Sequence, residues 1–123
     1  MSESQTMKVA VVGVCASGKT TLVSALRQFG IDAVDVAQEH SLVPHMWQVI
    51  TRPDVLIYLD ASHDTVRARW PYRGPVDWVD EQQRRLRHAR AHADLVISVD
   101  QLTPQQVLAR VLNALEAIDR RDV

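Results

Sequence analysis

The chain has little of several features that mark large classes of protein. Its 123 residues include one cysteine, Cys15, so no disulfide bond can form within the chain. Disulfides persist in oxidising compartments, and a lone cysteine therefore favours the reducing cytoplasm. The formal net charge is only -1, which predicts no general attraction to nucleic acid or to an anionic membrane surface.

Long hydrophobic runs are also missing. The apolar run that begins at Met7 is interrupted by Lys8 and ends at Gly13. This run is too short to cross a bilayer, and it lacks the flanking residues of a signal peptide. We therefore expect a cytoplasmic protein without a membrane partner. Residues 1–6 are polar, and we expect them to be disordered.

The remaining composition is that of an ordinary globular domain. Hydrophobic residues make up 46% of the chain and charged residues 24%, which is typical of such domains. The length is sufficient for one domain and too short for two. No repeat, low-complexity segment or linker interrupts the sequence, so we expect residues 1–123 to form a single domain.

Lysine is scarce, and one of the two lysines lies in the most informative stretch of the sequence. This stretch, GVCASGKTT at residues 13–21, fits the pattern Gly, four residues, Gly-Lys-Thr. The β-branched run before it predicts a buried strand, and the apolar spacing after it predicts an amphipathic helix. The apolar face of that helix comprises Leu22, Val23, Leu26 and Phe29. Strand, glycine-rich loop and helix form the context in which this pattern binds phosphate.

Each residue type in the pattern has a physical role in holding a phosphate chain. Gly13 lets the chain turn sharply out of the strand, and Gly18 lets the backbone approach a phosphate closely. Lys19 supplies a positive charge for the β- and γ-phosphates, and the Thr20 hydroxyl is a ligand for Mg²⁺. The helix N-terminus adds N–H groups that favour an anion. We expect the nucleotide to contact the whole loop: Gly13, Val14, Cys15, Ala16, Ser17, Gly18, Lys19, Thr20 and Thr21.

The rest of the chain alternates between strand-like and helix-like segments. Apolar runs predict three further strands, at 31–37, 54–60 and 94–100. Helices are predicted at 41–52, 62–70, 79–93 and from 103 onward, with a loop at 71–78. This alternation predicts an α/β fold with a small parallel sheet of about four strands and helices on both of its faces.

Three helix starts carry capping residues. Ser41 and Ser62 are candidate N-caps for the second and third helices. Thr103, Pro104 and Gln106 combine an N-cap, a proline in the first helical position and a capping-box partner. The last helix is therefore the one whose start is predicted most sharply.

Several stretches resemble the P-loop kinases of small molecules, a group that includes nucleoside, nucleoside monophosphate and shikimate kinases. The stretch GVCASGKTT resembles their phosphate loop, and RPDVLIYLDAS resembles a late strand of the thymidylate-kinase-like members. The stretch VRARW with the following PYRGP resembles their arginine-bearing lid. The stretch ADLVISVDQLTPQQV resembles their last strand, adenine loop and closing helix.

The resemblance implies a P-loop NTPase fold, a three-layer α/β/α sandwich, in a shortened form. It implies that the chain binds ATP and Mg²⁺, with Asp100 and Leu102 in the loop that packs on the adenine. It also implies an enzyme that transfers the γ-phosphate of ATP to a small-molecule acceptor. The segment that holds the acceptor in those kinases has no counterpart in this sequence, so the resemblance does not identify the acceptor.

Three carboxylates are candidates for holding Mg²⁺ or for activating an acceptor. Asp60 ends a strongly apolar strand, and this pattern alone favours it as the metal ligand. The resemblance instead favours Asp35, because residues 31–37 would take the strand position beside the phosphate loop. Glu39 follows shortly afterwards and is a candidate catalytic base. We therefore expect Asp35 to hold the metal with Thr20, and Asp60 is its rival.

Arginines gather in two places. Arg67, Arg69 and Arg73 lie in and before a loop rich in proline and glycine. Such a loop can close over phosphates and stabilise the charge of the transferred group. We expect Arg67 and Arg73, rather than Arg69, to act in this way. The arginines of residues 79–93 are flanked by acids, and we interpret them as a solvated helix face rather than as a nucleic-acid-binding patch.

Two smaller expectations concern sulfur and imidazole side chains. Cys15 lies at a helix N-terminus, and we expect it to react with alkylating reagents. His40 and His45 have no third ligand at a useful spacing, so the sequence predicts no metal centre built on them.

Three functions are compatible with a phosphate loop in a chain of this length. The first is a kinase that uses Mg-ATP and a small acceptor. The second is a nucleotide-binding module without transfer, with a regulatory or partner-binding role. The third, a GTPase switch, needs an Asn-Lys-x-Asp motif, which the sequence lacks. The sequence leaves open whether a second copy of the chain, in a homo-oligomer, completes the site.

Overall fold

The computed structural model describes residues 7–69 and 77–121. The expected disorder of residues 1–6 and the lid role of Arg73 lie outside these ranges. The elements, in chain order, are β1 (Lys8–Gly13), α1 (Lys19–Gln28), β2 (Asp32–Asp35), the 3₁₀ helix η2 (Gln38–His40), α2 (Met46–Thr51), β3 (Val55–Asp60), α3 (His63–Arg69), α4 (Asp77–Arg85), α5 (Arg87–His92), β4 (Leu95–Ser98) and α6 (Pro104–Arg121).

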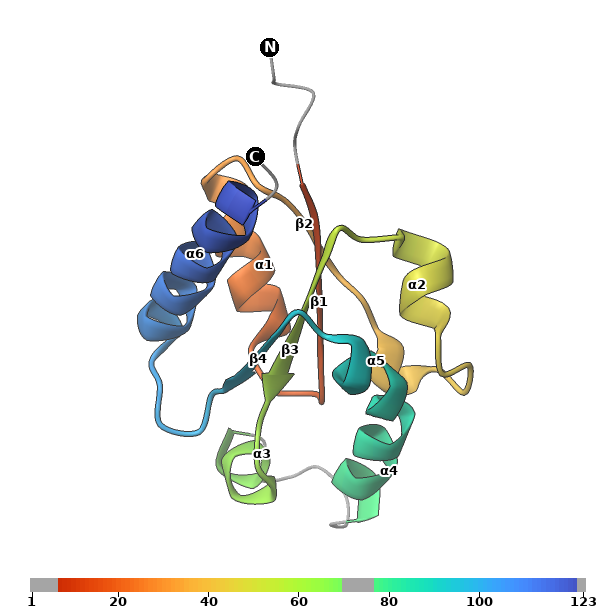
Figure 1. The fold of residues 1–123 in the computed structure, drawn as a ribbon. Helices are drawn as coiled ribbons and strands as arrows, with labels where there is room; N and C mark the ends of the chain where they lie inside the picture. Colours follow the sequence, from red (N-terminus) through yellow and green to blue (C-terminus); the bar gives the residue numbers. More distant parts are fainter. Residues whose placement is uncertain (1–6, 70–76, 122–123) are drawn as a thin grey trace.

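The four described strands form one parallel sheet in the order β2-β1-β3-β4. Helices α1 and α6 lie on one face of this sheet, and α2, α4 and α5 lie on the other (Figure 1). The predicted α/β class, the four parallel strands and the helices on both faces are confirmed. Because the strands are parallel, the C-terminal ends of β1, β2 and β3 meet at one edge of the sheet, where ligands collect in open α/β folds.

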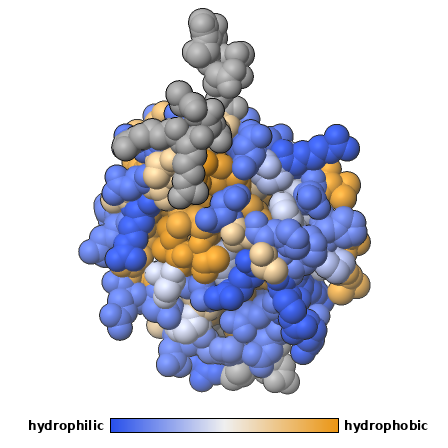
Figure 2. Space-filling view, in the orientation of Figure 1, coloured by the Kyte–Doolittle hydropathy of each residue, from blue (hydrophilic) through white to orange (hydrophobic). Residues whose placement is uncertain are grey.

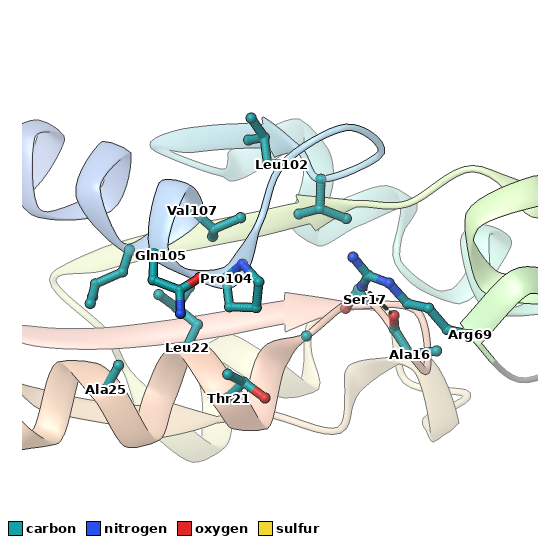
Figure 3. Close-up of a pocket in the computed structure, with 13 residues that line it drawn as sticks. Ala16, Ser17, Thr21, Leu22, Ala25, Arg69, Leu102, Pro104, Gln105 and Val107 are labelled. Carbon is teal, nitrogen blue, oxygen red and sulfur yellow. Dashed lines mark hydrogen bonds between the residues drawn. The ribbon is translucent and has the colours of Figure 1, made fainter.

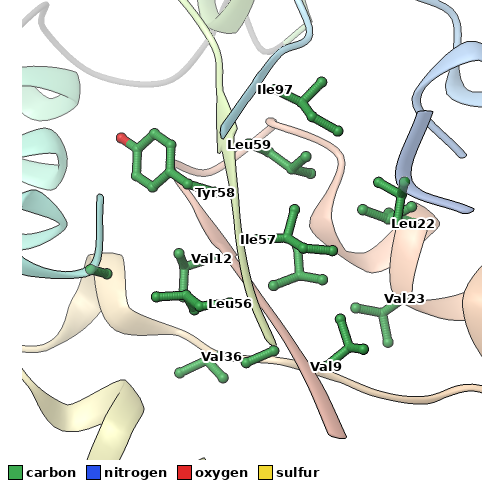
Figure 4. Packing of buried hydrophobic residues seen from close by; sticks show 14 of the residues in the cluster. Val9, Val12, Leu22, Val23, Val36, Leu56, Ile57, Tyr58, Leu59 and Ile97 are labelled. Carbon is green, nitrogen blue, oxygen red and sulfur yellow. The ribbon is translucent and has the colours of Figure 1, made fainter. Parts of the chain in front are cut away.

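The core lies on both faces of β3, as its uninterrupted apolar sequence predicts. Leu56 and Tyr58 point toward the face covered by α4 and α5, whereas Ile57 and Leu59 point toward α1 and α6 (Figure 4). All four side chains are buried. A strand alternates its side chains between the two faces, so a strand covered on both sides must be apolar throughout.

The ends of the first helix follow from its sequence. Gly30 has φ of 80° and donates its N–H to Arg27, while the next N–H, of Ile31, bonds to the carbonyl of Leu26. These two bonds form a Schellman motif, which needs a left-handed residue and therefore favours glycine. Phe29, expected on the buried face, is instead 62% exposed because it occupies the C-cap.

Two of the three predicted helix starts are confirmed. The N–H of Thr65 donates to Ser62 Oγ at 3.2 Å. Thr103 Oγ1 accepts from the N–H of Gln106 at 3.1 Å, and Gln106 Oε1 accepts from the N–H of Thr103 at 2.8 Å, which completes the capping box.

The second predicted helix was placed too early. Helix α2 begins at Met46 rather than after Ser41, whose Oγ accepts from the N–H of Val43 in a local turn. Pro44 explains the delay, since it disfavours helical geometry at the residue before it and has no N–H to donate. The end of this helix at Arg52, before Pro53, is confirmed.

The basic segment was also predicted incorrectly as one helix. It begins at Asp77, within the expected loop, and a turn at Leu86 divides it into α4 and α5. Leu86 is fully buried, and its N–H bonds to the carbonyls of both Gln82 and Gln83.

Exposed apolar side chains gather in the middle of one face of the molecule and at its right edge, where α2 lies (Figure 2). On α2, Val49 is 58% and Ile50 is 68% exposed, and Leu42 just before the helix is 80% exposed. No helix in the described ranges is long and apolar enough to cross a membrane.

Candidate functional site

Residues 13–20, here called the glycine loop, connect the end of β1 to the start of α1. A Cβ on Gly13 would lie 2.6 Å from Ser17 Oγ and 2.8 Å from the Leu59 carbonyl oxygen, so only glycine fits. Gly18 has φ of 100° and Ala16 has φ of 68°. Left-handed residues within a loop turn successive N–H groups inward, and this forms a concave anion-binding surface.

The N-terminus of α1 opens into this loop without a cap. The N-cap is Gly18, which has no side chain to offer, and the first turn contains no acidic residue. The N–H groups of Lys19, Thr20 and Thr21 have no acceptor within the helix, as in any first turn. An uncapped helix start with positive dipole character stabilises an anion.

Lys19 lies inside the loop rather than in solvent. Its ammonium group donates to the carbonyl oxygens of Gly13 at 3.0 Å and Val14 at 3.3 Å, and to Glu39 Oε2 at 2.8 Å. Lys19 is 8% exposed and Glu39 is 3% exposed. Each charge therefore compensates the burial of the other, and removing one alone is expected to be destabilising.

Two polar atoms beside this ion pair are not satisfied. Glu39 Oε1 and Ser17 Oγ are buried and have no hydrogen-bond partner among the described residues. Buried polar groups nearly always have a partner in folded proteins, so these two atoms have the capacity to bond a ligand, an ion or a water molecule.

The structure brings Thr20 and Asp35 together at the mouth of the loop. Thr20 Oγ1 donates to Asp35 Oδ2 at 2.9 Å. The contact follows from the topology, because β2 pairs directly with β1 and Val11 lies opposite Asp35 in the register. A hydroxyl and a carboxylate in contact provide the oxygen ligands that Mg²⁺ prefers.

Asp60, the rival acid, has a different neighbourhood. Its Oδ2 lies 3.5 Å from Arg90 Nη2, on the face of the sheet covered by α4 and α5. Tyr58 lies on the same face, and its burial, reinforced by the charge of Asp60, raises the pKa of its hydroxyl. No hydrogen bond joins Asp60 to the glycine loop within the described ranges.

A cavity of about 660 Å³ lies beside the glycine loop. Helix α1 forms one wall, and the segment from Leu102 to Val107 forms another (Figure 3). Most of the lining is apolar, and Gln105 and Arg69 are its larger polar side chains. The described lining residues are Ala16, Ser17, Gly18, Thr21, Leu22, Ala25, Arg69, Val99, Leu102, Pro104, Gln105, Val107 and Leu108.

Of the two residues expected in the adenine loop, Leu102 lines this cavity and Asp100 does not. Asp100 Oδ1 instead accepts hydrogen bonds from the Ser62 N–H at 2.9 Å and from Thr65 Oγ1 at 2.8 Å. The Ser62 bond above all holds the pKa of Asp100 below its ordinary value. Asp100 therefore caps the start of α3.

Arg69, rather than Arg67, reaches the glycine loop. Arg69 Nη1 donates to the carbonyl oxygen of Ala16 at 2.7 Å, at the mouth of the cavity (Figure 3). Arg67 is exposed and does not line the cavity. The expectation that ranked Arg67 above Arg69 is not supported by this geometry. Both lie on one short helix, and its orientation, which the sequence does not reveal, decides which side chain faces the loop.

Cys15 faces away from the cavity, toward η2 and α4. Its N–H donates to Gln82 Oε1 at 2.9 Å, and its Sγ lies 3.4 Å from both Gln82 Nε2 and His40 Nε2. Gln82 is 3% exposed and fixes one side of the loop. Sequence reasoning did not find Gln82, since a glutamine in a polar helix carries no distinguishing pattern.

No protein-family model matches the chain, and no curated protein matches it as a relative. Its function is therefore inferred from the site alone.

Proposed function

We propose that the chain is a shortened P-loop NTPase that binds Mg-ATP in the glycine loop and transfers the γ-phosphate to a small acceptor. The observation that carries this proposal is the hydrogen bond between Thr20 and Asp35 beside the buried ammonium of Lys19. A hydroxyl, a carboxylate and a buried ammonium converge there on an uncapped helix start, and groups of these types are what phosphoryl transfer needs.

Each part of the nucleotide has a matching feature in the described residues. The triphosphate would take the N–H groups of the loop and the Lys19 ammonium in place of Glu39. Mg²⁺ would be held by Thr20 and Asp35, where it would offset phosphate charge. The base would enter the apolar cavity, whose size of about 660 Å³ is within the range of ligand pockets.

Glu39 supports transfer over simple binding. Its carboxylate lies 2.8 Å from the ammonium that would contact the terminal phosphates, and one of its oxygens has no partner. A carboxylate in that position can accept the proton of an acceptor hydroxyl as the oxygen attacks phosphorus. The burial of Glu39 keeps it in a fixed place relative to the loop.

A nucleotide-binding module without transfer is the second candidate. The same ion pair favours it in a different way, because a buried carboxylate occupies the ammonium and repels a γ-phosphate. In such a module, Glu39 would act as a permanent partner of Lys19, and nucleotide binding would only change the conformation of the loop.

The test is a transfer assay on the full chain with labelled ATP, Mg²⁺ and a pool of small hydroxyl- and phosphate-bearing metabolites. A kinase yields a labelled product, whereas tight ATP binding without a product supports the module. Glu39→Gln should lower the transfer rate by about 100-fold or more, as loss of a general base does. The matched control is Glu81→Gln, a half-buried acid that pairs with Arg84 and Arg85 on α4.

A further inference from the structure

Three side chains of metal-ligating types meet on the outer side of the glycine loop, opposite the cavity. Cys15 Sγ lies 3.4 Å from His40 Nε2 and 4.0 Å from Glu39 Oε2, and His40 Nε2 lies 3.7 Å from the same oxygen. Within the described ranges these three residues form the one group of this kind whose ligand atoms all lie close together.

The size of this triangle matches a tetrahedral zinc site. Zinc bonds are about 2.3 Å to sulfur, about 2.0–2.1 Å to imidazole nitrogen and about 2.0–2.2 Å to carboxylate oxygen, so tetrahedral ligands lie about 3.3–3.6 Å apart. The three observed separations, 3.4, 3.7 and 4.0 Å, differ from those values by a few tenths of an ångström at most. A small rotation of the Glu39 carboxylate would close the difference, because that torsion is soft.

Glu39 has capacity left for an ion. A carboxylate offers about four lone-pair sites, and Glu39 Oε1 is buried without a hydrogen-bond partner among the described residues. The oxygen nearest Cys15 and His40 is Oε2, which also accepts from Lys19 at 2.8 Å. An ion would therefore share Oε2 with the ammonium or, after rotation of the carboxylate, bind Oε1. The Lys19 ammonium stays fixed by the carbonyl oxygens of Gly13 and Val14 and so does not depend on Glu39 alone.

The charges of the group also suit a dication. A thiolate and a carboxylate together neutralise the two charges of the ion. Lys19 then leaves about one net positive charge nearby, which an anion in the fourth coordination position would offset. Thiolate is a soft ligand that selects zinc-type ions over Mg²⁺, so this site differs in kind from the Thr20–Asp35 pair.

We propose that Cys15, Glu39 and His40 form a Zn²⁺ site with three protein ligands and one open position. Binding replaces the thiol proton of Cys15, which passes to solvent, with a sulfur–zinc bond. The His40 side chain is 55% exposed and provides the entry path. The ion would tie the glycine loop to η2. The site involves no nucleotide, but it shares the Glu39 carboxylate with the proposed transfer site, so a zinc ion bound here would occupy the proposed base.

The sequence did not predict this site because one of its three residues is far from the other two along the chain. Glu39 and His40 are adjacent, but Cys15 lies 25 residues before His40. Only the pairing of β2 with β1 brings η2 back to the glycine loop. His45, the partner considered from the sequence, contacts His88 instead.

The test is a titration of the reduced, metal-free full chain with Co²⁺, followed by displacement with Zn²⁺. We expect a near-ultraviolet thiolate-to-cobalt charge-transfer band, visible bands of tetrahedral intensity and a stoichiometry of one. Zn²⁺ should abolish both sets of bands and release a proton, which an indicator dye detects. Binding without the charge-transfer band would mean that exposed histidines bind the ion adventitiously, and this would overturn the proposal.

Three variants locate the ion. Cys15→Ser should abolish the charge-transfer band, and His40→Ala should weaken Co²⁺ binding by more than about tenfold. His63→Ala is the matched control, since His63 lies outside the proposed zinc site and pairs with Asp80 instead. Circular dichroism checks that each variant is folded. If His40→Ala binds Co²⁺ as the control does, with the same bands, the assignment of the site is wrong.

Discussion

The strands on either side of β1 both end in an aspartate, and the two aspartates lie in different surroundings. Asp35, at the end of β2, accepts a hydrogen bond from Thr20 of the glycine loop. Asp60, at the end of β3, faces Arg90 and shares its side of the sheet with the buried Tyr58. The end of β2 therefore contacts the glycine loop through Asp35, whereas the end of β3 contacts α5 through Asp60.

Alternation along the strand explains the difference. Asp60 has the same parity as Leu56 and Tyr58, so it points toward the face covered by α4 and α5. The Thr20 hydroxyl lies on α1, which covers the opposite face (Figure 1). An apolar strand that ends in an acid is a strong sequence pattern, but the direction of its last side chain decides whether the acid can reach the loop.

The largest effect on the affinity for Mg-ATP should come from replacing Lys19. Lys19→Met should lower the affinity for Mg-ATP by about 100-fold, since it removes a charge-assisted contact to the phosphates. It should be made together with Glu39→Gln, because a buried carboxylate without its partner would destabilise the fold. Calorimetry measures the affinity, and Lys8→Met, the only other lysine, is the matched control. Unchanged ATP binding by the double variant would refute the proposed phosphate site.

The next effect compares the two acids directly. Asp35→Asn should reduce the gain in ATP affinity that Mg²⁺ provides by about tenfold, the loss of one charged contact. Asp60→Asn should leave this gain close to the wild-type value. Binding is measured with and without Mg²⁺, so that a general loss of stability is not mistaken for a loss of metal binding. The reverse order of effects would make Asp60 the metal ligand.

The strands β1, β3 and β4 were predictable because each is a short apolar run between turn residues, and the parallel direction of the sheet followed from the alternation with helices. The start of α6 was predictable because Thr103, Pro104 and Gln106 act locally. Contacts between distant elements were not. Arg69 and Gln82 contact the glycine loop because the packing of α3 and α4 brings these distant segments of the chain beside it. Asp100 was expected to contact the nucleotide, but it instead accepts a hydrogen bond from Ser62 at the start of α3.

A smaller effect separates the two arginines of α3. Arg69→Ala should weaken ATP binding by about threefold, the magnitude of an exposed charged contact, because Arg69 lies at the mouth of the cavity. Arg67 lies two residues earlier on α3 and is exposed, so Arg67→Ala should have a smaller effect on ATP binding. Fluorescence titration with a labelled nucleotide can resolve differences of this size. A larger loss for Arg67→Ala would mean that α3 rotates when the nucleotide binds.

The smallest effect lies on the α5 face, away from the glycine loop. Trp47 Nε1 is only a donor, so the 3.2 Å contact requires His88 Nδ1 to accept and therefore to be unprotonated. Desolvation, together with the charges of His92 and His45, lowers the pKa of His88 below its ordinary value of 6.5. Below about pH 6.5 the unfolded chain therefore binds a proton more readily at His88 than the folded chain does, and stability falls as the pH falls.

Chemical denaturation at neutral pH and at about pH 5.5 measures this dependence. His88→Gln should make the stability less dependent on pH over this range, and His63→Gln, on α3, should not. If both variants keep the wild-type slope, another group is responsible and the contact with Trp47 survives protonation. A changed slope without a change in ATP affinity would show that the α5 face stabilises the fold independently of the loop.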